Sequence, residues 1–154
     1  MKINVKRLSV EGEQFAGAEP PTIMELEEEG LQFRHDIRYQ LLAQIQGDAL
    51  LVTGRLETVG TLCCGRCLQE FEQPLVVPAF VFHQELAGDD FVDLTPQIRE
   101  DIILELPQRA LCGESCKGLC PVCGADLNKR SCRCAVRRDD ARWAALNQLK
   151  INEE

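Results

Sequence analysis

Residues 35–67 read HDIRYQLLAQIQGDALLVTGRLETVGTLCCGRC, and this stretch determines the fold that we expect. Apolar side chains recur at every second position on both sides of Gln46-Gly47-Asp48, which is turn chemistry. The alternating sets are Ile37, Tyr39, Leu41, Ala43 and Ile45 before the turn, and Leu50, Val52, Gly54, Leu56, Thr58, Gly60 and Leu62 after it. We therefore predict a long antiparallel hairpin, in which Gly54 and Gly60 mark a bulge or a close approach of another backbone.

The segments around the hairpin predict an α+β fold with an antiparallel sheet that is twisted or partly closed. Residues 71–84 predict a third strand, and its two prolines favour an edge position or bulges. Residues 2–10 alternate and predict a first strand. Residues 11–32 read as an exposed connection, with a short helix around 22–29.

Two helices are expected in the second half of the chain. Thr95 as N-cap and Pro96 in the first turn start a helix over about 95–106, which Pro107 ends. A last helix begins near residue 139 and carries Trp143, Leu146 and Leu149. We expect a β domain with one helix over 1–108 and a Cys-rich zinc-binding segment with the last helix over 109–154, packed as one unit.

The composition is that of one ordinary globular domain, with 154 residues, 45% of them hydrophobic and 27% charged. The longest apolar run, residues 75–82, is interrupted by Pro78 and is too short to span a bilayer. The N-terminal residues contain no apolar signal region. We therefore expect a cytoplasmic protein with no membrane partner, in a reducing compartment where disulfides do not persist.

Nine cysteines in such a protein need a role other than disulfide pairing. Zinc prefers four thiolate or imidazole ligands, and two cysteines separated by two residues form a half-site, as at positions 64/67 and 120/123. We predict one or two bound Zn²⁺ ions, held by eight candidate ligands: Cys64, Cys67, Cys112, Cys116, Cys120, Cys123, Cys132 and Cys134.

The cysteine spacing leaves three groupings of these ligands open. One places 112, 116, 120 and 123 on one ion, and a second joins 64/67 to 120/123, as a zinc ribbon would. The third joins 64/67 to 112/116 and leaves 120, 123, 132 and 134 for a second ion. Cys63 makes the first half-site ambiguous, whereas His35 and His83 lie in strand patterns far from the Cys-rich segment.

Charge is unevenly distributed along the chain. The net charge is −8, but residues 109–150 carry nine Lys/Arg and four Asp/Glu, so that this segment is +5 and the remainder is −13. Basic side chains on a rigid metal site suit contacts with phosphate groups. Candidate nucleic-acid-binding residues are Arg66, Lys117, Lys129, Arg130, Arg133, Arg137 and Arg138. With 5% aromatic residues, sequence-specific reading of single strands by base stacking is not expected.

Several motifs resemble one known family. They are Cys64-Gly65-Arg66-Cys67-Leu68, Val92-Asp93-Leu94-Thr95-Pro96, Leu104-Glu105-Leu106-Pro107, Leu111-Cys112 and Cys116-Lys117-Gly118-Leu119-Cys120-Pro121-Val122-Cys123-Gly124, followed by Asp126-Leu127-Asn128, Cys132 and Cys134. Over about residues 35–150 the chain resembles the YceD family, described as large ribosomal RNA subunit accumulation proteins. The resemblance implies a role in the accumulation of that RNA and carries over no catalytic residue. Cys63 is extra to the family pattern.

Two functions follow as expectations. The first is a non-catalytic, zinc-binding ribosome-assembly factor that binds ribosomal RNA or a pre-ribosomal protein. The alternative is a zinc-stabilised protein-interaction module with no direct nucleic-acid contact, whose acidic β region binds a basic partner. Catalytic zinc keeps an open coordination position, whereas the cysteines of this chain provide ample ligands to fill a zinc site. The sequence also has no Gly-rich phosphate loop. We therefore expect neither an enzyme nor a small-molecule substrate.

Overall fold

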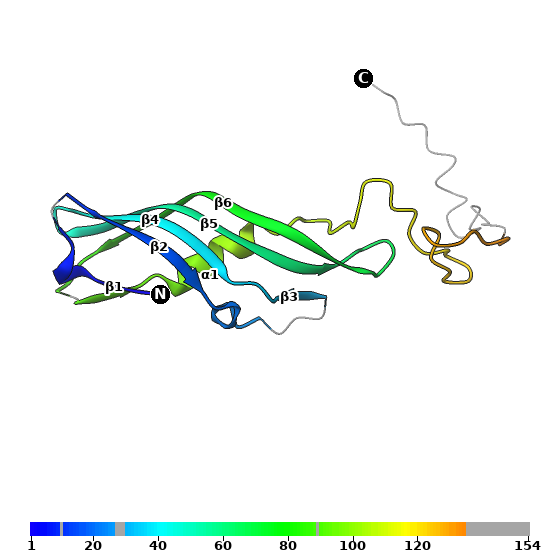
Figure 1. Cartoon of the computed structure of the whole chain (residues 1–154), viewed down its shortest axis with the longest axis horizontal. Helices are drawn as coiled ribbons and strands as arrows, with labels where there is room; N and C mark the ends of the chain where they lie inside the picture. Colours follow the sequence, from blue (N-terminus) through cyan, green and yellow to red (C-terminus); the bar gives the residue numbers. More distant parts are fainter. Residues whose placement is uncertain (10, 27–29, 89, 135–154) are drawn as a thin grey trace, which may run out of the picture. The chain divides into compact units, whose positions relative to one another are not determined.

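The predicted hairpin forms the centre of the main sheet in the computed structural model, which describes residues 1–9, 11–26, 30–88 and 90–134 (Figure 1). Its strands are β4 (Ile37–Gln46) and β5 (Ala49–Cys63). The other strands of this sheet are β2 (Glu13–Glu19), β3 (Leu31–Phe33) and β6 (Glu70–Glu85). β2 pairs with β4, and β3 and β6 both pair with β5, always antiparallel. The antiparallel α+β prediction is confirmed, but the sheet is not closed.

The described residues divide into two compact units. The first comprises Met1–Gly65 and Gln69–Cys112, and the second comprises Arg66–Leu68 and the described residues from Gly113 onward. All the named strands and the helix lie in the first unit, whereas residues 66–68 of the turn between β5 and β6 belong to the second.

A bulge interrupts the pairing of β5 with β6, as the glycine at position 54 predicts. Gly54 pairs with Phe80 and Leu56 pairs with Val77, so that β6 has one extra residue at Pro78-Ala79. A Cβ atom on Gly54 would lie 2.8 Å from the Leu41 Cα and would collide with the carbonyl of β4 next to it. Position 54 therefore requires glycine because the backbones of β4 and β5 approach closely there.

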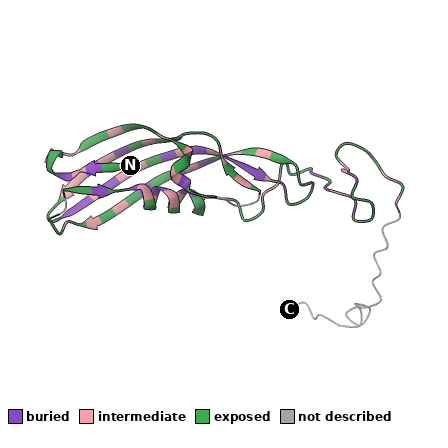
Figure 2. Cartoon of the chain, turned by 90° about the horizontal axis from the view of Figure 1, so that it is seen from below, coloured by how far each residue is buried: buried purple, intermediate pink, exposed green. Residues whose placement is uncertain are grey.

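Buried and exposed side chains alternate along the strands of the first unit (Figure 2). A second, two-stranded sheet pairs β1 (Lys2–Asn4) with β7 (Phe91–Asp93), and the helix α1 (Thr95–Leu104) packs against β6. The buried core is nearly all aliphatic: Ile3, Val5, Met24, Ile37, Leu41, Ala43, Leu50, Val52, Leu56, Leu75, Val77, Phe80, Val92, Leu94, Ile98 and Ile102.

Two sequence-based predictions near the N-terminus are correct only in part. The strand predicted over 2–10 ends at Asn4, because the Asn4 side chain accepts a hydrogen bond from the Lys6 N–H (3.1 Å) and starts a 3₁₀ turn over Val5–Arg7. The connection expected over 11–32 contains β2 and β3, with a 3₁₀ turn over Pro21–Met24 between them. β2 is hard to detect because Phe15 is its only large apolar residue.

The helix predicted over 95–106 is present, but its start differs from the prediction. Thr95 is the first helical residue and Leu94 occupies the cap position without a side-chain hydrogen bond. The Asp93 carboxylate accepts from the Thr95 N–H (2.9 Å) and supplies the capping contact that was expected of Thr95. No helix in the described part of the chain is long and apolar enough to span a membrane. The last predicted helix, near residue 139, lies outside the described residues.

Candidate metal centres

The hairpin of β5 and β6 ends in a tight turn that carries the first half-site. The Cys64 N–H donates to the Gln69 carbonyl (2.9 Å), which closes the turn. The Gly65 N–H donates to the Ala110 carbonyl (2.9 Å), two residues before Cys112. Cys64 and Cys67 are almost completely buried, with 0% and 2% exposure. Cys63 belongs to β5 and is not among the grouped thiols.

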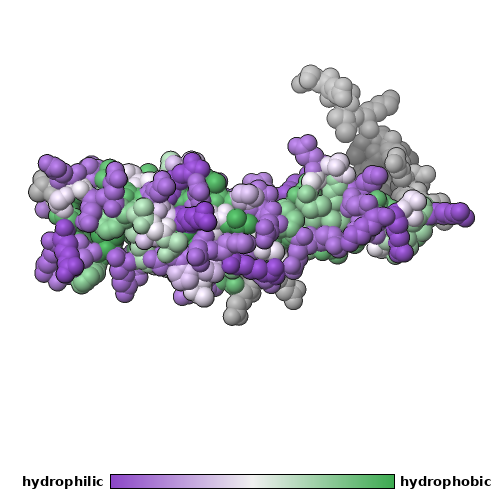
Figure 3. Space-filling model, viewed as in Figure 1, coloured by the Kyte–Doolittle hydropathy of each residue, from purple (hydrophilic) through white to green (hydrophobic). Residues whose placement is uncertain are grey.

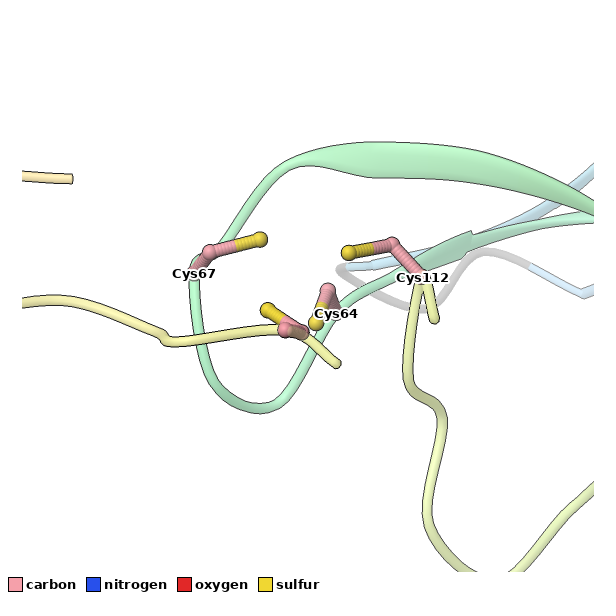
Figure 4. Close-up of side chains that lie close together, drawn as sticks. Cys64, Cys67 and Cys112 are labelled. Carbon is pink, nitrogen blue, oxygen red and sulfur yellow. The ribbon is translucent and has the colours of Figure 1, made fainter. Parts of the chain in front are cut away.

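The first group of thiols comprises Cys64, Cys67, Cys112 and Cys116, whose sulfur atoms all lie within 4.8 Å of one another. Figure 4 shows the sulfurs of the three labelled cysteines directed into a shared space. Four sulfurs that each lie ~2.3 Å from one tetrahedral zinc ion are separated by ~3.8 Å from each other. The group therefore has the donor set and the compactness that a metal ion with four thiolate ligands requires.

The second group comprises Cys120, Cys123, Cys132 and Cys134, again with all sulfurs within 4.8 Å. Two hydrogen bonds of 2.8 Å close the turn that carries Cys120 and Cys123. The Cys120 N–H donates to the Ala125 carbonyl, and the Gly124 N–H donates to the Cys120 carbonyl. Gly124 has φ +69°, a conformation that favours glycine. The two groups correspond to the third of the groupings left open by the spacing, while metal binding by these thiols stays a prediction.

The pKa values of two thiols in the second group indicate how a bound cation would change the ionisation of the group. The backbone N–H groups of Cys123 and Val122, which point at the Cys120 sulfur, lower the pKa of that thiol to about 6. Hydrogen bonding to Cys123, burial and the nearby charge of Cys123 and Cys120 raise the pKa of the Cys134 thiol to about 12. Because thiolates this close repel one another, all four ionise together only when a bound cation balances their charge.

Two side chains of the Asp126-Leu127-Asn128 motif, to which the sequence analysis assigned no role, organise the loop between the groups. The Asp126 carboxylate accepts from the Asn128 N–H and Nδ2 (both 2.9 Å), and these bonds hold its pKa below the usual value. Asn128 in turn accepts at Oδ1 from the Lys117 N–H (2.8 Å) and donates from Nδ2 to the Cys116 sulfur (3.5 Å). A hydrogen bond to a metal-ligating atom orients that ligand. The Asp-x-Asn spacing after a half-site is the signal that could have identified them.

Arg66 contacts the backbone next to the cysteines. Its Nη1 donates to the carbonyls of Cys116 (3.0 Å) and Glu114 (3.5 Å), while its own carbonyl accepts from the Leu119 N–H (3.0 Å). A Cβ atom on Gly118 would lie 2.9 Å from the Arg66 carbonyl oxygen. Part of the hydrogen-bonding capacity of Arg66 is therefore used in positioning the segment that carries Cys116.

The other candidate phosphate-binding residues are exposed. Lys117, Lys129, Arg130 and Arg133 all have solvent-accessible side chains, and Lys129 forms an ion pair with Asp126 (3.7 Å). Hydrophilic side chains project from the visible surface (Figure 3). Arg137 and Arg138 lie outside the described residues. The described part of the second unit has five Lys/Arg against two Asp/Glu, so basic residues outnumber acidic ones in the segments that carry its cysteines.

Leu68 occupies an unusual conformation beside the first group. It follows the second cysteine of its half-site, as Gly124 does in the other half-site, and its φ is +58°. Its side chain is 63% exposed. A leucine therefore adopts a backbone conformation that favours glycine, without burying its side chain in return.

Comparison with known proteins gives a consistent set of similarities. Residues 81–150 match the model of the family described as "Large ribosomal RNA subunit accumulation protein YceD". The chain is 39% identical over 59 residues to "Large ribosomal RNA subunit accumulation protein YCED homolog 1, chloroplastic" of Arabidopsis thaliana, a match that covers 38% of this chain and 18% of the plant protein. It is 32% identical over 101 residues to the uncharacterized protein YlbN of Bacillus subtilis, which covers 57% and 59% of the two chains.

An uncharacterized protein of Mycobacterium tuberculosis is 30% identical over 119 residues, or 66% of this chain and 56% of that protein. The chain thus spans less than two thirds of the length of these relatives. No solved structure matches the chain.

Proposed function

Because this chain belongs to the YceD family, we propose that it is a non-catalytic, zinc-binding factor that supports accumulation of large-subunit ribosomal RNA by binding that RNA. The observation that carries the proposal is the pair of four-cysteine groups in chain segments that also carry exposed basic side chains. Cysteines in the thiol form suit a reducing compartment, and we propose that the protein works in the cytoplasm.

Zinc is the metal that these donors fit best. Four thiolates at tetrahedral spacing are the ligand set of structural zinc sites, in which no coordination position is left for a substrate. When bound, zinc supplies positive charge that keeps the four thiols of a group deprotonated and holds their chain segments together. Under this proposal the eight cysteines stabilise the second unit, and contact with a partner falls to the side chains around them.

The side chains proposed to contact RNA phosphates are Lys117, Lys129, Arg130 and Arg133, with Arg66 contributing the donors that its backbone contacts leave free. Each filled four-thiolate site has a formal charge of −2, so the basic side chains also offset the charge of the metal centres. Five phosphate contacts with single-stranded RNA give a slope of log affinity against log salt of about −3.5. Contacts of this kind position an RNA without reading its sequence.

Filter binding with a large-subunit ribosomal RNA fragment tests this proposal. We expect the zinc-loaded protein to bind with a strong salt dependence. The triple variant Lys129→Gln/Arg130→Gln/Arg133→Gln should bind about tenfold or more weakly and lose about two units of the salt slope. Zinc content, measured on the same samples, confirms that the variant retains its metal.

The matched control is Arg34→Gln/Arg38→Gln/Arg55→Gln, which removes the same charge from exposed positions of the first unit. We expect its affinity to stay within twofold of the unchanged protein. Equal losses in the two triple variants, or no salt-dependent binding by the zinc-loaded protein, would contradict direct RNA binding and favour the alternative of a protein-interaction module.

A further inference from the structure

β2 forms a free edge of the main sheet (Figure 1). It pairs with β4 over all seven residues, so that Glu13 lies opposite Ala43 and Glu19 lies opposite Ile37. No described strand pairs with its other side. Such an edge presents alternating N–H and carbonyl groups that another extended chain can pair with. Natural proteins usually protect an edge of this kind with proline, lysine or a bulge.

The opposite edge of the sheet has that protection and β2 lacks it. β6 contains Pro74 and Pro78, each of which removes a backbone donor, and a bulge at Pro78 interrupts its regular pairing. The sequence of β2, EQFAGAE, contains neither proline nor lysine, and its pairing with β4 is regular throughout. Of the two long edge strands, β2 is therefore the one that remains competent to accept a strand, while the third edge strand, β3, has only three residues.

The charges at the two ends of β2 determine which strand fits. Glu13 and Glu19 lie at its two ends, and Glu11 lies just before it. If β2 paired antiparallel with β2 of a second copy in the centred register, Glu13 would face Glu19 at both ends, and like charges directly opposite destabilise a strand pair. The same acids attract a strand that has lysine or arginine at positions six residues apart.

The side chains between the two acids leave room for an added strand. On one face of β2 lie Gln14, Ala16 and Ala18, of which the two alanines are small and exposed. On the other face, Phe15 is half-buried against the core and Gly17 lies beside the Tyr39 hydroxyl. An incoming strand would therefore extend this face with apolar side chains next to Phe15 and could carry any compact residue on the other face.

We propose that the β2 edge binds a basic, extended polypeptide segment by antiparallel strand addition. The segment is recognised by main-chain hydrogen bonds along residues 13–19, by cationic side chains opposite Glu13 and Glu19, and by apolar side chains opposite Phe15 and Gly17. This site uses the first unit alone and does not depend on the metal centres or on RNA binding. It gives the protein a second surface, for a basic protein partner.

The probe for this proposal is the synthetic peptide Lys-Thr-Val-Thr-Val-Thr-Lys, titrated into the isotope-labelled full chain and followed by NMR. We expect chemical-shift changes centred on residues 13–19, together with at least tenfold slower solvent exchange of those β2 amides that point away from β4. The peptide Glu-Thr-Val-Thr-Val-Thr-Glu should bind at least fivefold more weakly, with the difference shrinking as salt is added.

A charge-swap variant makes the test specific. Glu13→Lys/Glu19→Lys should reverse the preference, binding the acidic peptide better than the basic one. Glu85→Lys, on the exposed end of β6, should leave the original preference intact. Thermal melting followed by circular dichroism checks that both variants are folded. Shift changes confined to other surfaces, no binding at millimolar peptide, or association of β2 with β2 of a second copy would each overturn the proposal.

Discussion

At the scale of single residues, Leu68 shows a conformational cost that its equivalent, Gly124, avoids. Both follow the second cysteine of a half-site and both have positive φ, +58° and +69°. A left-handed backbone costs a residue with a Cβ atom about 1–2 kcal/mol relative to glycine. Since the Leu68 side chain is mostly exposed, little burial energy offsets that cost.

Replacing this leucine should therefore stabilise the protein. We expect Leu68→Gly to raise the free energy of unfolding of the zinc-loaded protein by about 1 kcal/mol, because it relieves the strain at positive φ. The reciprocal change Gly124→Leu should lower it by about 1–2 kcal/mol. Urea denaturation of both variants measures the two values. A destabilised Leu68→Gly would show that the side chain contributes packing that its exposure does not reveal.

Asp93 should make a pH-dependent contribution at the start of α1. Hydrogen bonds from the Thr95 hydroxyl and N–H lower its pKa from the ordinary value of 3.8. A carboxylate whose pKa is lower in the folded state stabilises the fold above its unfolded pKa, and this stability is lost as the pH falls below about 4. Because the group is largely exposed, the effect stays below about 1 kcal/mol.

The variant Asp93→Asn removes this titration. We expect its melting temperature to fall less steeply than that of the unchanged protein between about pH 5 and pH 3, while it is slightly less stable at pH 7. Melting curves followed by circular dichroism across this pH range measure the difference. Parallel curves for the two proteins would show that Asp93 makes no net contribution at the helix start.

At the scale of elements, Gly54 controls the packing of β4 against β5. A Cβ atom there would collide with the backbone of β4 at Gln40 and Leu41, so that two neighbouring strands must separate to accommodate it. We expect Gly54→Ala to lower the free energy of unfolding by about 1–3 kcal/mol. A matched control is Gly113→Ala, where a Cβ atom meets nothing within 4 Å, and we expect less than about 0.5 kcal/mol there. Similar losses at both positions would contradict the close approach.

How much of the fold can be read from the sequence depends on how each element is buried. β4 and β5 bury one face each, so their apolar residues recur at period two and both strands are predictable from Ile37 to Leu62. β2 lies at an edge and contacts the core mainly through Phe15, so its sequence carries almost no periodic signal. A strand that depends on a partner's backbone rather than on its own burial is not detectable from local pattern.

The grouping of the cysteines in the candidate site can likewise be predicted only in part from the local sequence. A C-x-x-C pair is recognisable from local spacing, because the turn itself directs both sulfurs to one point. Which pairs share a group depends on contacts between segments far apart in sequence, such as the Gly65–Ala110 hydrogen bond. Spacing alone therefore left three groupings open, and the structure brings together 64/67 with 112/116.

At the scale of the whole molecule, charge and apolar burial are distributed differently between the two units. By sequence, the first unit has 8 Lys/Arg against 19 Asp/Glu, a net charge of −11, whereas the second is +3. The hydrophobic core consists entirely of residues of the first unit, and the buried apolar residues described in the second are small: Cys67, Cys116, Cys120 and Ala125. The described part of the second unit therefore lacks the apolar burial that would hold it folded without metal.

Metal removal should accordingly affect the two units unequally. Structural zinc contributes roughly 10–16 kcal/mol, comparable to or larger than the ~5–15 kcal/mol stability of a whole domain. We expect chelation under reducing conditions to abolish amide protection over residues 113–134, while β4, β5 and α1 keep theirs because their core is separate. Hydrogen exchange read by mass spectrometry distinguishes the two regions. Unchanged protection over 113–134 after complete metal removal would contradict a metal-dependent second unit.

Eight cysteines that form two metal centres should give each metal ion four sulfur ligands. Zinc X-ray absorption on the purified, reduced protein, combined with metal analysis, measures both the ligands and the number of ions. We predict two zinc ions per chain, each with four sulfur neighbours at ~2.3 Å and no nitrogen or oxygen ligand. One zinc ion or none per chain, or an oxygen or nitrogen atom among the zinc ligands, would contradict two metal centres with four sulfur ligands each.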